Sequence, residues 1–153
     1  MQFSLSTAVV ALAALVGTVV GETHTVHFSN NCRFGIPTLI QGGVILSNGG
    51  TDYVSNGPLS SAIAYLQTGS CGFNGENCTL IETTLVNTAT LDSGSLTGIS
   101  LLSPHKFSVP TGFNYFNGCN GAGADCTSQN CPAQSAPVSC KADNVNLNIT
   151  FCA

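Results

Sequence analysis

The chain has 153 residues, with three Lys and Arg against seven Asp and Glu, so its formal net charge is −4. Only 7% of the residues are charged, whereas 43% are hydrophobic and Trp is absent. Three basic side chains are too few to follow a phosphate backbone or to form a polybasic patch, which argues against a nucleic acid and against an anionic membrane surface as the partner. The scarcity of Glu and Lys also argues against a helical bundle, whose solvated faces need them.

Residues 9–20 form an apolar run, which Gly21 follows. Its length suits the core of a signal peptide and is short for a membrane span. We therefore expect a signal peptide over residues 1–21 and one secreted domain over residues 22–153, too short for two good cores. The leader lacks Lys and Arg, so an uncleaved amphiphilic terminus is the alternative. No second apolar stretch follows, and we expect no membrane span in the mature chain.

All eight cysteines follow the leader, at positions 32, 71, 78, 119, 126, 131, 140 and 152. An even number in an exported chain predicts four disulfides, although the count does not fix how they pair. Zinc is the competing interpretation, but the paired spacings that it needs are absent, so we expect no metal and no cofactor. Two sequons, at Asn77 and Asn148, indicate a glycoprotein. Asn148 is the better acceptor, because Asn77 adjoins a cysteine.

In chain order, short β-prone runs are separated by turn residues. The first, residues 23–29, places Val26 and Phe28 on one face. Residues 38–40 and 44–46 flank two glycines, which predicts a hairpin. Later runs cover residues 51–54, 62–67 and 79–87, and the last two surround a loop between two cysteines.

The final run, residues 145–151, alternates apolar residues with Asn and Thr, as a half-buried strand requires, and turns Asn148 outward. Between Gly118 and Ser139 the chain is mostly small residues, Pro and Cys without periodicity, so we expect a loop region held by disulfides. Together these segments predict an all-β, disulfide-rich antiparallel β-sandwich with a short Cys-rich loop region.

Six segments carry a family resemblance in the same order along the chain. They are VHFSNNC at 26–32, TGSCGFNG at 68–75, TLIE at 79–82, ISLL at 99–102 with the later Val109-Pro110, CPA at 131–133, and ITFC at 149–152. These segments are similar to elements of thaumatin-like proteins, a family of secreted, disulfide-rich β-sandwiches. The matches span nearly the whole mature chain.

The resemblance implies how the cysteines pair. It pairs the first with the last, Cys32–Cys152, and closes a short loop with Cys71–Cys78. It also implies Cys119–Cys140, which leaves Cys126–Cys131. The large second domain of the family is missing here, so the chain resembles a shortened member.

The resemblance also places Glu82 at the position of a glutamate in an acidic cleft linked with β-1,3-glucan binding and, in some members, with hydrolysis. Two aspartates of that cleft are replaced, one by Gly98 and the other by Ser103. Hydrolysis of a glycoside needs two carboxylates, so a single acid favours binding over catalysis. Asp52 or Asp92 could supply a second carboxylate from elsewhere in the chain.

Phe113 and Tyr115 share a strand face and could form an aromatic platform for a sugar, with a place in the core as the alternative. We expect a secreted monomer of the extracellular space or cell wall. It would bind β-1,3-glucan or a related polysaccharide without turning it over, through Glu82, Asp52, Tyr115 and Phe113. Two other functions stay open. One is an endo-β-1,3-glucanase that uses Glu82 with a second carboxylate, and the other is a structural glycoprotein of the extracellular matrix.

Overall fold

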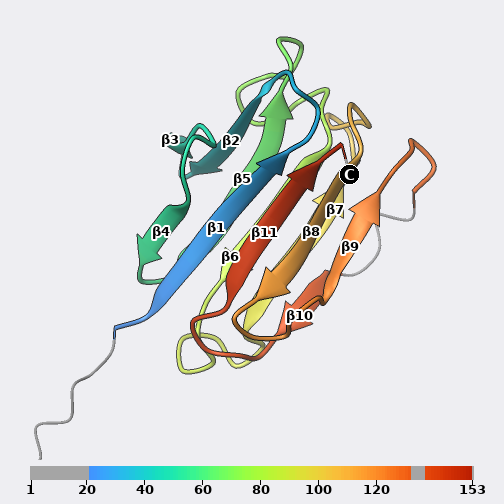
Figure 1. The fold of residues 1–153 in the computed structure, drawn as a ribbon. Coiled ribbons are helices and arrows are strands. Elements are labelled where there is room, and N and C mark those ends of the chain that lie inside the picture. The colour runs from blue at the N-terminus through green and yellow to red at the C-terminus, as the bar shows by residue number, and fades with distance from the viewer. Residues whose placement is uncertain (1–20, 132–136, 153) are drawn as a thin grey trace, which may run out of the picture.

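The computed structural model describes residues 21–131 and 137–152, which form two packed β-sheets (Figure 1). The predicted signal peptide therefore lies outside the described residues, apart from Gly21. The strands are β1 (Thr23–Asn30), β2 (Ile36–Gln41), β3 (Val44–Ser47), β4 (Tyr53–Asn56), β5 (Leu59–Gln67), β6 (Leu80–Leu85), β7 (Ser95–Ser100), β8 (Thr111–Phe116), β9 (Gly123–Cys126), β10 (Val138–Cys140) and β11 (Asn146–Phe151).

One sheet, called sheet A, has the strand order β4-β1-β11-β8-β9, and the other, sheet B, has the order β10-β7-β6-β5-β2-β3. The predicted all-β sandwich is confirmed. Neighbouring strands are antiparallel except for β1 and β11, which pair in parallel from Val26 with Leu147 to Asn30 with Phe151. Across residues 21–131 and 137–152 there is no helix long and apolar enough to cross a bilayer.

The core lies between the two sheets and follows the side-chain alternation of the strands. In β11, Leu147, Ile149 and Phe151 are fully buried, whereas the Asn and Thr residues between them are only half-buried. Phe28 of β1 stacks on Phe151 with ring centroids 6.3 Å apart. Because successive side chains of a strand point to opposite faces, this pattern fixes which side of β11 meets sheet B.

Phe113 and Tyr115 belong to this core, so the predicted exposed aromatic platform is wrong. Phe113 is 3% exposed and Tyr115 is 0% exposed, and their rings meet edge to face. The Tyr115 hydroxyl lies 2.9 Å from both Thr97 Oγ1 and the carbonyl oxygen of Val138, which belong to sheet B. Burial raises the pKa of Tyr115 to about 12, against the opposing effect of the hydrogen bond with Thr97. Tyr115 thus links the two sheets instead of facing a ligand.

Four disulfides are present, with the pairing that the resemblance implied: Cys32–Cys152, Cys71–Cys78, Cys119–Cys140 and Cys126–Cys131. The first spans 120 positions of the sequence. It lies just beyond the pairing of Asn30 with Phe151, where β1 and β11 end side by side (Figure 1). This bond therefore joins the chain just after the first strand to the chain just after the last strand, at a point where backbone pairing already brings the two together.

The region between Gly118 and Ser139 is more regular than its composition indicates. β9 and the start of β10 lie within it and pair with β8 and β7 respectively. Gly123 of β9 lies so close to the backbone of Phe113 and Asn114 that a Cβ there would collide with it. The strand therefore depends on backbone pairing and small residues, which carry no signal of hydrophobic periodicity. The predicted run at residues 51–54 is also displaced, because β4 begins at Tyr53.

Candidate functional site

Glu82 lies on the outer face of sheet B, in a row of residues that crosses four strands. Strand register pairs Ile40 of β2 with Ile63 of β5, Ile63 with Glu82 of β6, and Glu82 with Gly98 of β7. A hollow of about 300 Å³ opens over the Glu82 end of this row. Gly98 contributes no side chain to fill it, and a Cβ there would have Pro137 as its nearest neighbour, at 3.7 Å.

The hollow combines hydroxyl groups and apolar side chains around one carboxylate. Its lining includes Ser61, Ile63, Thr84, Leu96 and Pro137 around Glu82. At the rim, the pairing of β5 with β6 shifts register between Leu59 and Ala62, and the backbone N–H of Ser61 donates to Thr84 Oγ1 at 3.0 Å. Such bulges commonly lie next to binding sites, because they redirect side chains at a strand edge.

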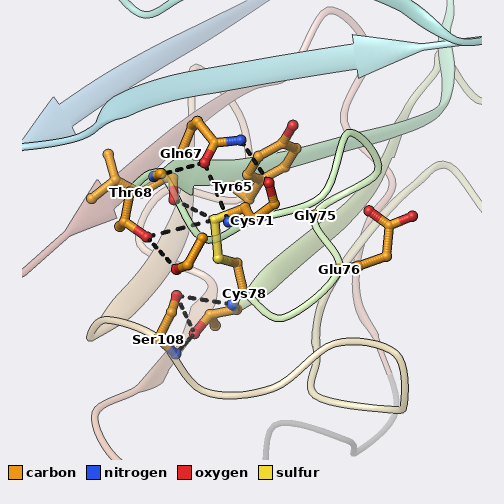
Figure 2. Close-up of a disulfide and its surroundings, with 12 residues drawn as sticks. Tyr65, Gln67, Thr68, Cys71, Gly75, Glu76, Cys78 and Ser108 are labelled. Atoms are coloured by element: carbon orange, nitrogen blue, oxygen red, sulfur yellow. Dashed lines mark hydrogen bonds between the residues drawn. A yellow bond between two sulfur atoms is a disulfide. The ribbon is translucent and has the colours of Figure 1, made fainter.

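The loop closed by Cys71–Cys78 packs on the adjoining part of the same face, and Figure 2 shows its disulfide beside Tyr65. Beneath it, Ile40, Tyr65 and Leu80 form a small second core, and the Tyr65 hydroxyl donates to the carbonyl oxygen of Phe73 at 2.7 Å. Burial and, to a smaller degree, the Glu76 carboxylate raise the pKa of Tyr65. Because Leu80 precedes Glu82 by two residues on the same face of β6, the covered region ends beside the hollow.

The loop is held by its own hydrogen bonds. Gln67 accepts from the backbone N–H of Cys71 at 3.3 Å and donates to the carbonyl oxygen of Cys71 at 3.0 Å (Figure 2). Gly75, at φ 79°, lies against Tyr65 and Leu80, and a Cβ there would come within 2.6 Å of the Leu80 side chain. The loop therefore forms a fixed wall at one end of the exposed face.

Glu82 is the only acidic residue among those that line the hollow in the described structure. Asp52 precedes β4 of sheet A and accepts a hydrogen bond from Nδ1 of His27 at 2.6 Å. The structure therefore does not bring Asp52 and Glu82 together. Asp92 is exposed between β6 and β7, and Glu76 accepts from the backbone N–H of Asn74 within its own loop.

The remaining acids have structural contacts or lie on sheet A. Glu22 accepts hydrogen bonds from the backbone N–H of Asn87 and from the hydroxyl of Thr90, and His24 Nε2 lies 3.0 Å from it. Burial alone would raise the pKa of Glu22, but the hydrogen bonds, that with His24 first, lower it overall. Asp143 accepts from the backbone and hydroxyl of Thr88, and Asp125 belongs to β9.

One carboxylate in a hollow suits hydrogen bonding to sugar hydroxyls better than acid–base catalysis. Glycoside hydrolysis uses two carboxyl groups, roughly 5–5.5 Å apart for retention and 6.5–9.5 Å apart for inversion. In the described structure no hydrogen bond or ion pair occupies the Glu82 carboxylate, which is exposed and free to accept. Residues 21–131 and 137–152 also contain no group of three or more His, Cys, Asp or Glu that could hold a metal ion.

The two sequons lie in different settings. Asn77 is exposed in the Cys71–Cys78 loop, whereas Asn148 is half-buried on the outer face of β11. Nδ2 of Asn148 donates to Asn114 Oδ1 at 3.1 Å and to Thr150 Oγ1 at 3.3 Å. Asn148 faces outward as predicted, and glycosylation at either position stays a prediction.

No protein-family model and no curated protein matches this chain. Thirteen chains of solved structures do match. One is the structure of a thaumatin-like xylanase inhibitor, which superposes with a TM-score of 0.54 and 21% sequence identity over 85% of this chain and 99% of that chain. At this identity the likeness shows the fold alone. The chain has a thaumatin-like fold, and the resemblance inferred from its sequence is confirmed at that level.

Proposed function

We propose that this protein is a secreted binding protein for β-1,3-glucan or a related cell-wall polysaccharide and that it does not hydrolyse its ligand. The observation that carries the proposal is the Glu82 hollow, in which one carboxylate, without a hydrogen-bond partner among the described residues, stands beside the bare backbone of Gly98. Four disulfides support an oxidising, extracellular location. The protein would act as a monomer in the extracellular space or cell wall.

The hollow has the chemistry that a neutral sugar chain requires. Glu82 accepts hydrogen bonds from sugar hydroxyls, and the hydroxyls of Ser61 and Thr84 add donors and acceptors at the rim. Ile63 and Leu96 offer apolar surface to the C–H faces of the sugar ring. Since Gly98 has no side chain, the ligand can approach the strand backbone beside Glu82.

The other functions have weaker support. An endo-β-1,3-glucanase would need a second carboxylate next to Glu82, and the lining of the hollow offers none among the described residues. The solved structure of a thaumatin-like xylanase inhibitor favours a second candidate, in which this face would bind a polysaccharide-degrading enzyme in place of the polysaccharide. A purely structural role in the extracellular matrix would need no ligand at Glu82 at all.

Co-sedimentation of the oxidised, secreted protein with insoluble β-1,3-glucan tests the proposal. Glu82→Gln keeps the size of the side chain and removes its charge, and we expect it to weaken binding roughly tenfold or more, since hydrogen bonds to charged groups are the strong ones. Asp92→Asn is the matched control, because it removes the same charge from an exposed position outside the hollow. The control should bind like the unchanged protein.

Each alternative has a separate readout. Reducing sugar released by the unchanged protein and abolished in Glu82→Gln would establish the glucanase. Inhibition of a xylanase or glucanase, without sedimentation on the polysaccharide, would establish enzyme binding. Equal sedimentation of Glu82→Gln and Asp92→Asn would remove Glu82 from the site and overturn the proposal.

A further inference from the structure

We propose that the outer face of sheet A carries a second binding site and that its ligand is a neutral saccharide. A hollow of about 440 Å³ opens there, and its lining consists of His27, Ser29, Asp52, Asn114, Phe116 and Asn148. This face belongs to the sheet that does not contain Glu82. The inference shares only its ligand class with the proposed function, so either can fail without the other.

Strand register assembles this hollow from distant parts of the chain. His27 of β1 pairs with Asn148 of β11, and Asn148 pairs with Asn114 of β8, so the three side chains form one row across the sheet. Ser29 and Phe116 lie two residues along their strands from this row and therefore share its face. The row is on the opposite side of the sheet from the buried core residues of the same strands.

Hydrogen bonds already hold the polar groups of this row in place. Asn148 Nδ2 donates to Asn114 Oδ1 at 3.1 Å, and Ser29 Oγ donates to Asn148 Oδ1 at 3.4 Å. Nδ1 of His27 lies 2.6 Å from Asp52 Oδ1, and because a carboxylate only accepts, Nδ1 carries the proton. The side chains of His27 and Asp52 are 47% and 53% exposed. In the described part of the chain, Nε2 of His27 and the second carboxylate oxygen of Asp52 have no hydrogen-bond partner, so both are available to a ligand.

The composition of the hollow selects for an uncharged ligand rich in hydroxyl groups. Among the described lining residues the ionisable ones are His27 and Asp52, which hydrogen-bond to each other, so the hollow offers no Lys or Arg for a phosphate and a single carboxylate for a cation. The amide and hydroxyl oxygens of Asn114, Asn148 and Ser29 can still accept from sugar hydroxyls, and the second amide N–H of Asn114 can donate to them. Phe116 is half-buried at one side and offers a ring face for the C–H groups of a pyranose. The volume is within the range of small-molecule sites.

The same chemistry can come from two sources. Asn148 begins a sequon and lies in the lining of the hollow, so an N-linked glycan on this residue would start inside it, next to Asn114. A free polysaccharide could occupy the hollow instead when Asn148 carries no sugar. In both cases the contacts are with His27, Asn114 and Phe116.

The experiment therefore has two arms, both read by NMR on the full mature protein. In the first, protein from a secreting eukaryotic host is mapped for a glycan on Asn148. If the glycan is present, we expect cross-relaxation between its first N-acetylglucosamine units and the Phe116 ring. In the second, unglycosylated protein from a bacterial periplasm is titrated with a β-1,3-linked glucose hexamer and with diacetylchitobiose. We expect the side-chain amides of Asn114 and Asn148 to shift.

Matched variants separate this site from that of Glu82. Phe116→Leu keeps the apolar volume and removes the flat ring, and it should weaken the sheet A response roughly tenfold. Asp125→Ala, exposed on β9 of the same sheet and outside the hollow, should leave the response unchanged, as should Glu82→Gln. The proposal is overturned if a glycan on Asn148 makes no contact with Phe116 or His27 and the unglycosylated protein responds to neither sugar. It is also overturned if Phe116→Leu, with an unchanged melting temperature, responds as the unchanged protein does.

Discussion

Removing the Cys32–Cys152 disulfide should cost more stability than removing any other disulfide of this domain. The bond closes a loop that spans 120 positions, whereas Cys71–Cys78 spans seven. The loop-entropy relation gives about 5 kcal/mol for the long loop and about 2.5 kcal/mol for the short one. Since domains of this size are stable by roughly 5–15 kcal/mol, the first loss takes a third or more of the total.

The double variant Cys32→Ser/Cys152→Ser measures this loss, and Cys71→Ser/Cys78→Ser is its matched control. Urea unfolding followed by far-ultraviolet circular dichroism and tyrosine fluorescence gives both free energies by linear extrapolation. Both variants remove two sulfurs and one bond, so their difference of about 2.5 kcal/mol reports the loop length. Equal costs, or a larger cost for the short loop, would refute the reasoning. Such a result would mean that strain in the folded state or residual structure in the unfolded chain, and not loop length, sets the cost.

Three further perturbations test the core, the N-terminal contacts and the Glu82 hollow. Tyr115→Phe removes the hydroxyl that links the sheets and should lower the free energy of unfolding in urea by about 1–3 kcal/mol, because its buried partners lose a hydrogen bond. An unchanged free energy would show that water replaces the hydroxyl. In the folded protein the pKa of Glu22 lies below its ordinary value of 4.5, because its hydrogen bonds, that with His24 first, outweigh the effect of burial. The stability that Glu22 contributes is therefore present above pH 4.5 and is lost as the pH falls through the folded pKa. Glu22→Gln should flatten that part of the stability profile measured by thermal melting, and an unchanged slope would count against this role. Gly98→Val fills the hollow beside Glu82, and its Cβ would lie at an ordinary contact distance of 3.7 Å from Pro137. Sedimentation with glucan should therefore fall, whereas the melting temperature should stay the same or rise. Full binding by a folded variant would place the ligand elsewhere.

Much of the strand pattern was predictable because it depends on neighbours in the sequence. The alternation in residues 145–151 predicts both the β11 strand and its buried side, and the structure confirms them. The glycine pair at 42–43 predicts the hairpin of β2 with β3. Strand β9 was not predictable in this way, since small residues that pair through the backbone give no periodic apolar signal.

The candidate site was predictable only in part. Glu82 was named from a resemblance, and its outward direction follows from the register of β6 with β5 and β7. The contribution of Asn114 and Phe116 to the second hollow could not be read from the chain, because it depends on β8 lying beside β11 in space. The alternation of apolar and polar residues around Asn148 shows that this residue faces outward, but it does not show which residues of other strands share that face.

The sequence by itself determined the class of this protein: a β-rich chain with few charges, eight cysteines and an order of motifs that resembles one family. Only the tertiary structure decided that Phe113 and Tyr115 point into the core and that Glu82 and Asp52 belong to different sheets. The reason is that β8 has aromatic residues on both faces, Phe113 and Tyr115 on one and Phe116 on the other, so the alternation alone does not say which face is buried. That choice is made by the sheet that packs against the strand, and therefore by residues far away in the chain.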